Sequence, residues 1–162
     1  MGDEEISDNP DIVSFLKNNH IAVLATANKM TAVPHAAAIY YGTNSKLDVF
    51  FLSKESTTKS KNLADNPQAT IVIYEATTQK TAQIYGPVEI VDDSNMMERV
   101  KSLMSKYSEE TAGTSEIPLS KIDGGEYVLY KLTPQSVRLG EYKYGPKGDI
   151  FQTAVSPGTP LD

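Results

Sequence analysis

The sequence predicts a mainly β protein with accessory helices, built as an antiparallel barrel or sandwich. Six candidate strands follow one another closely within 162 residues, and turn signals such as Gly42-Thr43-Asn44-Ser45 join most of them as hairpins. The sequence contains neither the Gly-x-Gly-x-x-Gly fingerprint of a dinucleotide site nor a Walker-type phosphate loop. Because tight hairpins connect antiparallel strands, these observations disfavour a doubly wound parallel sheet.

Each expected element has a local signal in the sequence. Asp8 or Asn9 can cap a first helix, with Pro10 at its first helical position. Pro67 stops a second helix, and apolar residues spaced i, i+3 and i+4 define a third. Pro134 allows a bend in the last strand. The expected helices span residues 10–19, 57–66 and 94–107, and the expected strands span residues 21–27, 31–41, 47–53, 69–76, 80–91 and 126–139.

The length of the chain suits one domain. A chain of this size buries roughly 70% of the surface that it exposes when unfolded. Residues 1–8 carry charge without an apolar period, so we predict a flexible tail there, followed by the domain over residues 9–140. Residues 141–162 are dense in Gly and Pro and are predicted to form an irregular tail.

The composition excludes several kinds of function. The sequence has no Cys, which rules out disulfides, thiolate metal sites and a thiol nucleophile. Its net charge of -6 argues against a nucleic-acid partner, because phosphate backbones are bound through basic surfaces. No apolar run approaches the roughly 18 residues of a membrane span, and the acidic N-terminus is unlike a targeting peptide. We therefore expect a cytoplasmic protein that binds neither membranes nor nucleic acid.

A candidate anion site lies where the third strand passes into the second helix. Residues 53–61 hold three Lys and one Glu, a local charge of +2 within an acidic protein. Backbone N–H groups at a helix N-terminus attract anions. Thr57 can cap the helix, while Thr58 and Lys59 can reach a phosphate from its first turn. An ordinary capped helix with solvated lysines would explain the same residues.

The strand before it is a candidate platform for a flat ligand. Three consecutive alanines at 36–38 leave little side chain on either face, so a ring can lie close to the backbone. Tight packing against a helix would explain them equally well. Three interpretations of His35 are open: a core histidine with a protein hydrogen-bond partner, a phosphate contact, or a metal ligand. The other histidine, His20, has no ligand spacing to it, so we propose no metal site, and no catalytic residues can be assigned.

Four segments, taken in order, resemble the pyridoxamine 5′-phosphate oxidase-like, FMN-binding split-barrel family. They are Pro-His-Ala-Ala-Ala-Ile at 34–39, Val-Phe-Phe-Leu-Ser at 49–53, Thr-Thr-Lys-x-x-Asn-Leu-x-x-Asn-Pro at 57–67 and Ile-Tyr-Gly-Pro-Val-Glu at 84–89. The third segment is the most specific, and the resemblance covers residues 10–139. It implies a six-stranded antiparallel split barrel and a homodimer with two FMN sites at the subunit interface.

The resemblance also implies which residues hold FMN. Thr58 and Lys59 fall where the family holds the phosphate, and His35 falls where members often have a phosphate-binding arginine. Thr81 or Gln83 matches a family glutamine that bonds the ring, with a register uncertain by two residues. The implied cofactor-binding residues are His35, Ala36, Ala37, Ala38, Ile39, Tyr40, Leu52, Ser53, Thr57, Thr58, Lys59, Thr81 and Gln83.

Departures from the family pattern shape the expected function. Histidine in place of arginine at position 35 weakens phosphate binding near neutral pH, because a free imidazole is mostly uncharged there. After the last strand the family's oxidases carry a Trp and then an Arg–His segment, whereas residues 140–143 read Gly-Glu-Tyr-Lys and the sequence has no Trp. We expect a flavin-dependent oxidoreductase acting on an unknown small molecule rather than a true pyridoxamine-phosphate oxidase. The alternatives are a non-catalytic flavin-binding or sensing protein, a split barrel that binds a deazaflavin or haem, and a purely structural β domain.

Overall fold

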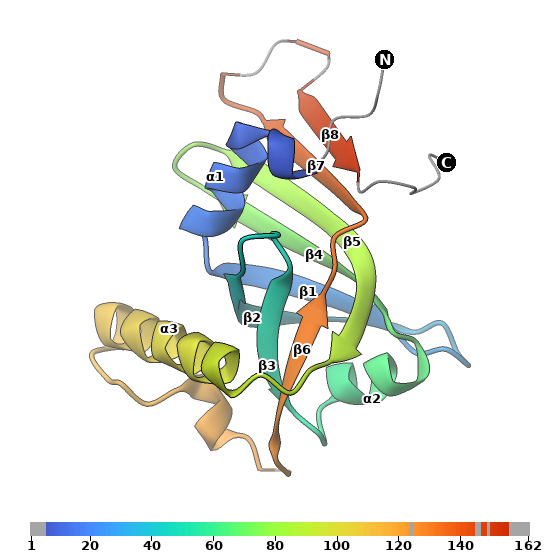
Figure 1. Cartoon of the computed structure of the whole chain (residues 1–162), viewed down its shortest axis with the longest axis vertical. Coiled ribbons are helices and arrows are strands. Elements are labelled where there is room, and N and C mark those ends of the chain that lie inside the picture. The colour runs from blue at the N-terminus through green and yellow to red at the C-terminus, as the bar shows by residue number, and fades with distance from the viewer. Residues whose placement is uncertain (1–5, 124, 145–146, 149, 156–162) are drawn as a thin grey trace.

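Six antiparallel strands close into a barrel in the computed structural model, which describes residues 6–123, 125–144, 147–148 and 150–155. The sheet order is β4-β1-β2-β3-β6-β5-β7-β8, and a further β4–β5 pairing closes the ring of the first six strands (Figure 1). The predicted six-stranded antiparallel barrel is therefore confirmed. The barrel strands are β1 (Ile21–Ala27), β2 (Pro34–Thr43), β3 (Val49–Lys54), β4 (Gln68–Glu75), β5 (Lys80–Ile90) and β6 (Tyr127–Leu132).

Three α-helices flank this barrel, as the sequence predicts. Asn9 caps α1 (Pro10–Asn18), because its Oδ1 accepts hydrogen bonds from the backbone N–H groups of Asp11 and Ile12. The second helix, α2 (Thr58–Asp65), lies near the opposite end of the barrel (Figure 1). The third, α3 (Ser94–Ala112), runs further than the predicted end at residue 107. It stops at Gly113, whose φ of 67° is the left-handed conformation that favours glycine.

The predicted last strand over residues 126–139 is in fact two strands. β6 pairs with β3 and with the last part of β5, whereas β7 (Ser136–Glu141) pairs with the first part of β5. Between them Thr133 donates from its backbone N–H to Pro87 O at 3.0 Å, and Gln135 donates to Tyr85 O at 2.8 Å. The chain thus crosses over β5 at Gly86, the residue between these two acceptors.

Both predicted tails differ from the structure where it describes them. Ile6 is buried in a short 3-10 helix, η1 (Ile6–Asp8), in place of a flexible segment, and residues 1–5 lie outside the described residues. In the C-terminal segment β8 (Phe151–Val155) pairs with β7, although an irregular tail was predicted. Its strand is stabilised by the burial of Ala154 and Val155 and by Phe151, which covers Gly140. Residues 156–162 lie outside the described residues.

Two hydrophobic cores hold the fold together. The larger fills the barrel and includes Tyr41, Phe51 and the apolar face of α1. The smaller lies outside the barrel, where Val100 and Met104 of α3 pack on Phe50 and on neighbouring residues. β3 is therefore buried on both faces, which explains its unbroken apolar run. Within the described part of the chain, none of the helices combines the length and apolar composition needed to cross a bilayer.

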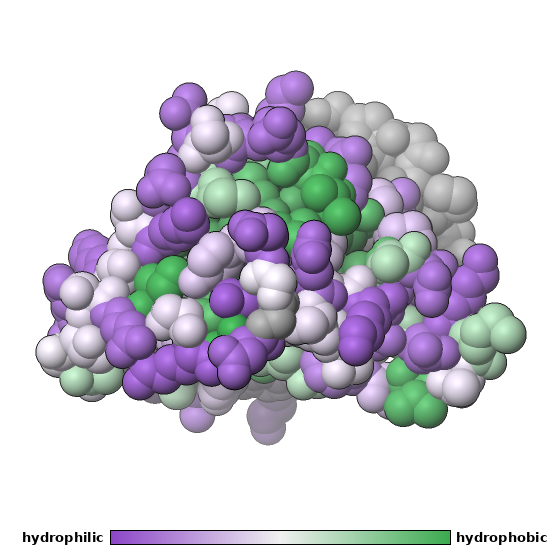
Figure 2. Space-filling view, turned by 90° about the horizontal axis from the view of Figure 1, so that it is seen from below, coloured by the Kyte–Doolittle hydropathy of each residue, from purple (hydrophilic) through white to green (hydrophobic). Residues whose placement is uncertain are grey.

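The outer face of β1 remains open. β1 alternates between exposed and buried residues, and Ile21 and Val23 are 48% and 45% exposed on its outer side. Hydrophobic surface is also seen between hydrophilic residues when the molecule is viewed from below (Figure 2). The side chains of Ile21 and Val23 leave apolar surface on this side of the sheet.

Candidate functional site

Hydroxyl groups tie the end of β3 to the start of α2. Thr57 is the N-cap of the helix, and its Oγ1 accepts from the backbone N–H of Ser60 at 3.4 Å and donates to Lys54 O at 2.9 Å. The Oγ of Ser53, a fully buried residue, lies 2.8 Å from Thr57 Oγ1. The cap predicted at Thr57 is confirmed. The hydroxyls of Ser53 and Thr57 are engaged in shaping this turn, which leaves the next two residues to meet a ligand.

The side chains of those two residues, Thr58 and Lys59, make no hydrogen bond or ion pair with any described residue. Thr58 is exposed at the first position of the helix, whereas Lys59 is only 7% exposed. Burial lowers the pKa of the Lys59 ammonium, because desolvation disfavours the charged form. Among the described buried side-chain atoms that lack a hydrogen-bond partner, Lys59 Nζ is not found, so the end of this side chain keeps some contact with solvent while its stem is buried.

The side chain of Lys59 lines a cavity of about 120 Å³ on the outer side of β2. Its walls include five residues that the sequence analysis assigned to cofactor binding: Ala38, Ile39, Tyr40, Leu52 and Lys59. The other lining residues come from α3 and from the segment around η2 (Pro118–Lys121), and they are Met104, Pro118, Leu119 and Ile122. The structure thus joins the alanine-rich strand and the lysine of α2 in one largely apolar cavity.

The side chain of His35 lies close to α2 but on the inner side of β2. His35 pairs with Thr26 across the β1–β2 ladder, and Thr26 Oγ1 accepts from Asn62 Nδ2 at 3.1 Å. Asn62 is one helical turn after Lys59. His35 Nδ1 is buried and has no hydrogen-bond partner in the described part of the chain. A protein partner for this nitrogen, one of the three interpretations of His35, is therefore not found.

The registers place Ala36, Ala38 and Gln83 on the outer face of the sheet and Ala37, opposite the buried Leu24, on its inner face. Ala38 lies opposite Val23, Val23 opposite Val72, and Val72 opposite Gln83, so the four residues form one row. Three strand spacings separate the ends of this row, a distance of about 14 Å. Gln83 and the alanine-rich strand of one chain therefore do not meet. Ala36 is exposed like Ala38, whereas Ala37 is half-buried.

The structure distinguishes Thr81 from Gln83, the two residues that could match the glutamine of the family. Thr81 is 6% exposed, and its Oγ1 donates to Ile73 O at 3.1 Å. Gln83 is half-buried, and its amide has no hydrogen-bond partner among the described residues. Gln83 is therefore the one of the two that retains hydrogen-bonding capacity.

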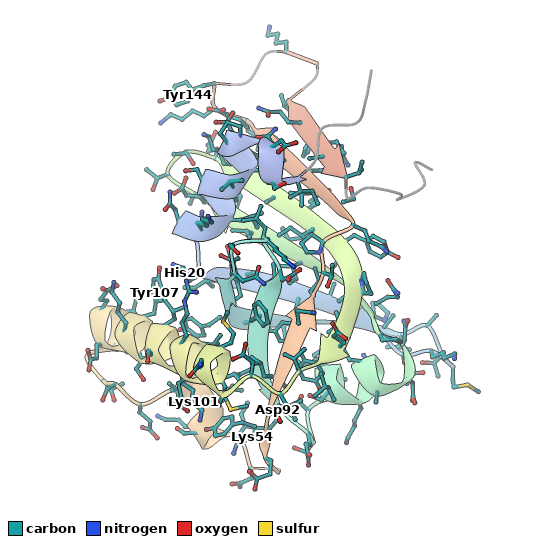
Figure 3. All side chains as sticks on the ribbon, viewed as in Figure 1. His20, Lys54, Asp92, Lys101, Tyr107 and Tyr144 are labelled. Carbon is teal, nitrogen blue, oxygen red and sulfur yellow. The ribbon has the colours of Figure 1, made fainter. Side chains whose placement is uncertain are left out.

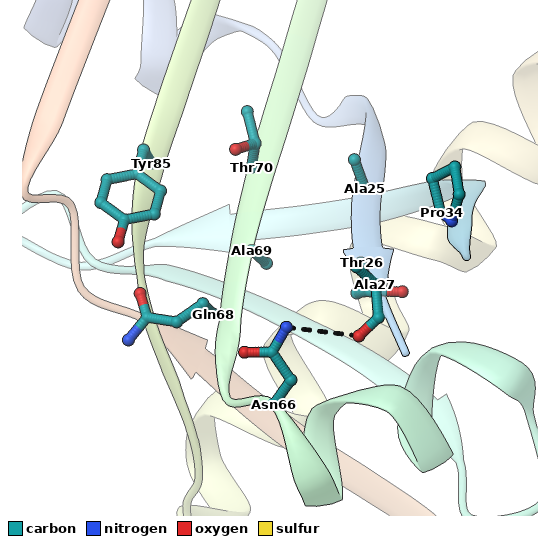
Figure 4. Close-up of a pocket in the computed structure, with 9 residues that line it drawn as sticks. All are labelled: Ala25, Thr26, Ala27, Pro34, Asn66, Gln68, Ala69, Thr70 and Tyr85. Carbon is teal, nitrogen blue, oxygen red and sulfur yellow. Dashed lines mark hydrogen bonds between the residues drawn. The ribbon is translucent and has the colours of Figure 1, made fainter. Parts of the chain in front are cut away.

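A second pocket, of about 270 Å³, opens beside this row and was not predicted (Figure 4). Asn66 Nδ2 donates to Ala27 O at 3.3 Å at its edge, and Tyr85 stands across from them. Its lining comes from β1, β2, β4, β5 and the end of α2, and it consists of Ala25, Thr26, Ala27, Pro34, Asn66, Gln68, Ala69, Thr70 and Tyr85. Small residues spread over several strands gave no local signal from which this pocket could be found.

A closed six-stranded antiparallel barrel with three flanking helices defines a split-barrel protein, with an unpaired lysine in the first turn of its second helix. The family model described as pyridoxamine 5′-phosphate oxidase matches residues 9–139, and the chain belongs to this family. No curated protein matches the sequence. The family assignment therefore rests on the family model.

Solved structures show the same fold at low sequence identity. A putative pyridoxamine 5′-phosphate oxidase from Listeria innocua is 20% identical with a TM-score of 0.60, over 83% of this chain and 98% of that one. A pyridoxamine 5′-phosphate oxidase-related, FMN-binding protein from Nostoc punctiforme is 13% identical with a TM-score of 0.57, over 91% and 97%. A protein from Mesorhizobium loti described as FAD-binding is 16% identical with a TM-score of 0.60, over 80% and 89%.

Replacing the Lys59 ammonium should stabilise the ligand-free protein. We expect Lys59→Met to raise the free energy of unfolding at neutral pH by on the order of 1 kcal/mol, because it removes an unpaired charge. The pKa of Lys59 is 10.5 in the unfolded chain and lower in the folded protein. Between these two pKa values the unfolded state binds more protons than the folded state, so the free energy of unfolding of the wild type rises with pH there. The advantage of Lys59→Met should therefore shrink as pH rises toward 10.5.

Urea unfolding of both proteins at neutral and alkaline pH measures this difference. Lys61→Met is the matched control, because Lys61 is exposed on the same helix. A Lys59→Met protein that is less stable than wild type at neutral pH would show that the ammonium has a stabilising partner.

Proposed function

We propose that the protein is a homodimeric FMN-binding flavoprotein and acts as a flavin-dependent oxidoreductase on a small molecule. The observation that carries this proposal is the buried Lys59, whose unpaired ammonium shares a cavity with Ala38, Tyr40 and Leu52. A phosphate dianion supplies the negative charge that this ammonium lacks. The strand of small residues beside it leaves room for a flat ring.

The donors near α2 fit a phosphate monoester. Lys59 offers an ammonium and Thr58 an exposed hydroxyl, and neither side chain has a hydrogen-bond or ion-pair partner among the described residues. Charge-assisted hydrogen bonds of this kind are among the strongest in proteins. The N-terminus of α2 adds backbone N–H groups with a favourable dipole. The unpartnered Nδ1 of His35 lies on the inner side of β2, the opposite side of this strand from the cavity at Lys59.

The residues of this chain would then bind and shield the cofactor. Met104, Leu119 and Ile122 form an apolar wall that excludes water from the cavity at Lys59. When bound, the flavin ring supplies the hydride or electron transfer that no side chain here can perform.

A second copy of the chain is part of this proposal. Gln83 lies about 14 Å along the outer face from Ala38 of its own chain, too far for both to contact one ring. A partner packed on the same face can bring its own Gln83 to the alanine-rich strand. The exposed Ile21 and Val23 on that face favour such packing.

An acidic residue on this face should disrupt the dimer. We expect Val23→Asp to shift the protein toward a monomer, because a carboxylate buried in an apolar interface loses its hydration. The variant should also lose FMN affinity, since each site would need both chains. Light scattering after gel filtration measures the mass of the protein in solution.

Ile90→Asp is the control, because Ile90 is another exposed apolar residue. A wild-type protein that is monomeric in solution would contradict the proposal.

Absorbance of the purified protein and titration with flavin test the cofactor directly. We expect saturable quenching of FMN fluorescence and a flavin spectrum, with parallel titrations against FAD, a deazaflavin and haem. Tighter binding of one of the other three would reassign the cofactor. If FMN binds, anaerobic addition of reduced nicotinamide should bleach the flavin band. Bound FMN that no reduced nicotinamide bleaches would favour a non-catalytic, flavin-sensing role.

A further inference from the structure

A third, more polar cavity of about 370 Å³ lies between the end of α1, the turn from β2 to β3, and α3. It is lined by Lys17, His20, Thr43, Asn44, Ser45 and Arg99. None of these residues lines the cavity at Lys59. His20 and Tyr107 mark its neighbourhood between α1 and α3 in Figure 3, where their rings lie 5.7 Å apart. The proposed flavin site makes no use of this cavity.

Two cations from different helices face it without counter-ions. Lys17 and Arg99 form no ion pair with any described residue, although the chain as a whole is acidic. On α3 the other basic residues are neutralised, because Lys101 and Lys106 each pair with a glutamate of the same helix, at 3.1 and 4.0 Å. Arg99 has no such neighbour. The residues three and four positions away from it are Asn95, Met96, Ser102 and Leu103.

Hydrogen-bond donors complete the lining. Thr43 is only 6% exposed, and its hydroxyl has no partner in the described part of the chain. The Ser45 hydroxyl at the adjacent turn is also unpartnered there. His20 Nδ1 lies 3.3 Å from Tyr41 O, so a proton on Nδ1 would leave Nε2 to meet a ligand. That nitrogen can accept a hydrogen bond or, once protonated, donate one.

The negative groups nearby are already engaged. The Asp48 carboxylate accepts from Asn44 Nδ2 at 2.8 Å, and its charge helps to raise the pKa of Lys131. At the end of α1, Asn19 Nδ2 donates to Phe15 O at 2.9 Å, which satisfies one of the exposed carbonyls there. Asp48 keeps its charge behind Asn44, whereas the lining of the cavity itself holds two cations and no carboxylate.

We propose that this cavity binds the phosphate group of a small molecule, held by Lys17, Arg99 and Thr43. A phosphate matches the set because it accepts several hydrogen bonds and carries the opposite charge. The cavity has the size of small-molecule pockets, so a phosphomonoester fits as well as free phosphate. The two sources share the same recognition chemistry and differ in what fills the remaining space.

Titration of the full-length protein, followed through its backbone amide signals by NMR, tests the proposal. The probes are inorganic phosphate and glycerol 3-phosphate at constant ionic strength. We expect saturable shifts at the amides of Thr43, Ser45 and Arg99 in wild type. Arg99→Gln should weaken the affinity by about two- to fivefold, the range for an exposed charge pair, and a double variant with Lys17→Gln by about tenfold.

Lys106→Gln is the matched control, since it removes one positive charge from the same helix outside the cavity. Retained binding in Lys106→Gln and in Lys59→Ala would support a separate site. Tighter binding of glycerol 3-phosphate would identify a phosphomonoester as the ligand, and equal affinity would identify phosphate. Shifts that do not saturate, or an equal loss in Lys106→Gln, would overturn the proposal. Melting temperatures of all variants show whether each remains folded.

Discussion

Gly86→Ala should lower the free energy of unfolding by about 3 kcal/mol, the upper part of the range for forcing extra volume into a packed site. A Cβ at Gly86 would lie 2.0 Å from Thr133 O and 3.3 Å from the backbone nitrogen of Gln135. Both neighbours are backbone atoms held by hydrogen bonds to Pro87 and Tyr85, so they cannot move aside as a side chain would. The crossing of the chain over β5 would have to open.

Thermal unfolding measures this effect. A loss of this size corresponds to a fall of roughly 6–12 °C in the melting temperature of a domain of this length. Gly42→Ala is the control, because a Cβ there would meet only side chains, Leu103 at 3.3 Å and Val100 at 3.6 Å. Equal melting temperatures for the two variants would mean that the crossing at Gly86 is looser than the structure shows.

The crossing at Gly86 is a feature of the fold that could not be predicted from the sequence. Hairpin signals between neighbouring segments are local, and they were sufficient to predict six antiparallel strands in a barrel or sandwich; the choice of a split barrel came from the family resemblance. The division of the last strand depends on how Thr133 passes Gly86, two residues 47 positions apart in the sequence. The strand β8 was missed for a related reason, because the Gly- and Pro-rich segment around it has the composition of a loop. Only its pairing with β7 makes it a strand.

In the candidate site, too, local features could be predicted from the sequence and features that depend on tertiary packing could not. The motif after β3 is continuous in sequence, so the cap at Thr57 could be inferred from a single helix turn, whereas the burial of Lys59 depends on the tertiary packing around it. Met104 and Leu119 gave no such signal, because their place in the cavity wall depends on how α3 and η2 fold back onto β2 and β3. The choice between Thr81 and Gln83 required the strand register and the hydrogen bond that engages the Thr81 hydroxyl.

Lys59→Ala should raise the dissociation constant for FMN by about 10- to 150-fold. The basis is the loss of about 1.5–3 kcal/mol, the range for a hydrogen bond to a charged group. Lys59 is 7% exposed and lines the cavity, so water screens its interaction with a phosphate less than it screens a fully exposed lysine. Lys61→Ala is the matched control, because it removes the same charge from an exposed position on the same helix. Its dissociation constant should remain within about twofold of wild type.

The pH dependence of FMN affinity separates a direct contact from a general effect on the fold. Burial lowers the pKa of Lys59 in the free protein, so its positive charge is lost before pH 10.5. Wild-type affinity should therefore fall as pH rises from neutrality into the alkaline range, while the already weaker affinity of Lys59→Ala should change little. Fluorescence titration across this range gives both curves. Parallel curves for the two proteins, or a Lys59→Ala affinity equal to that of wild type, would place the phosphate away from α2. If the phosphate binds at Lys59, the same unpaired ammonium that destabilises the ligand-free protein is the main source of the affinity for FMN.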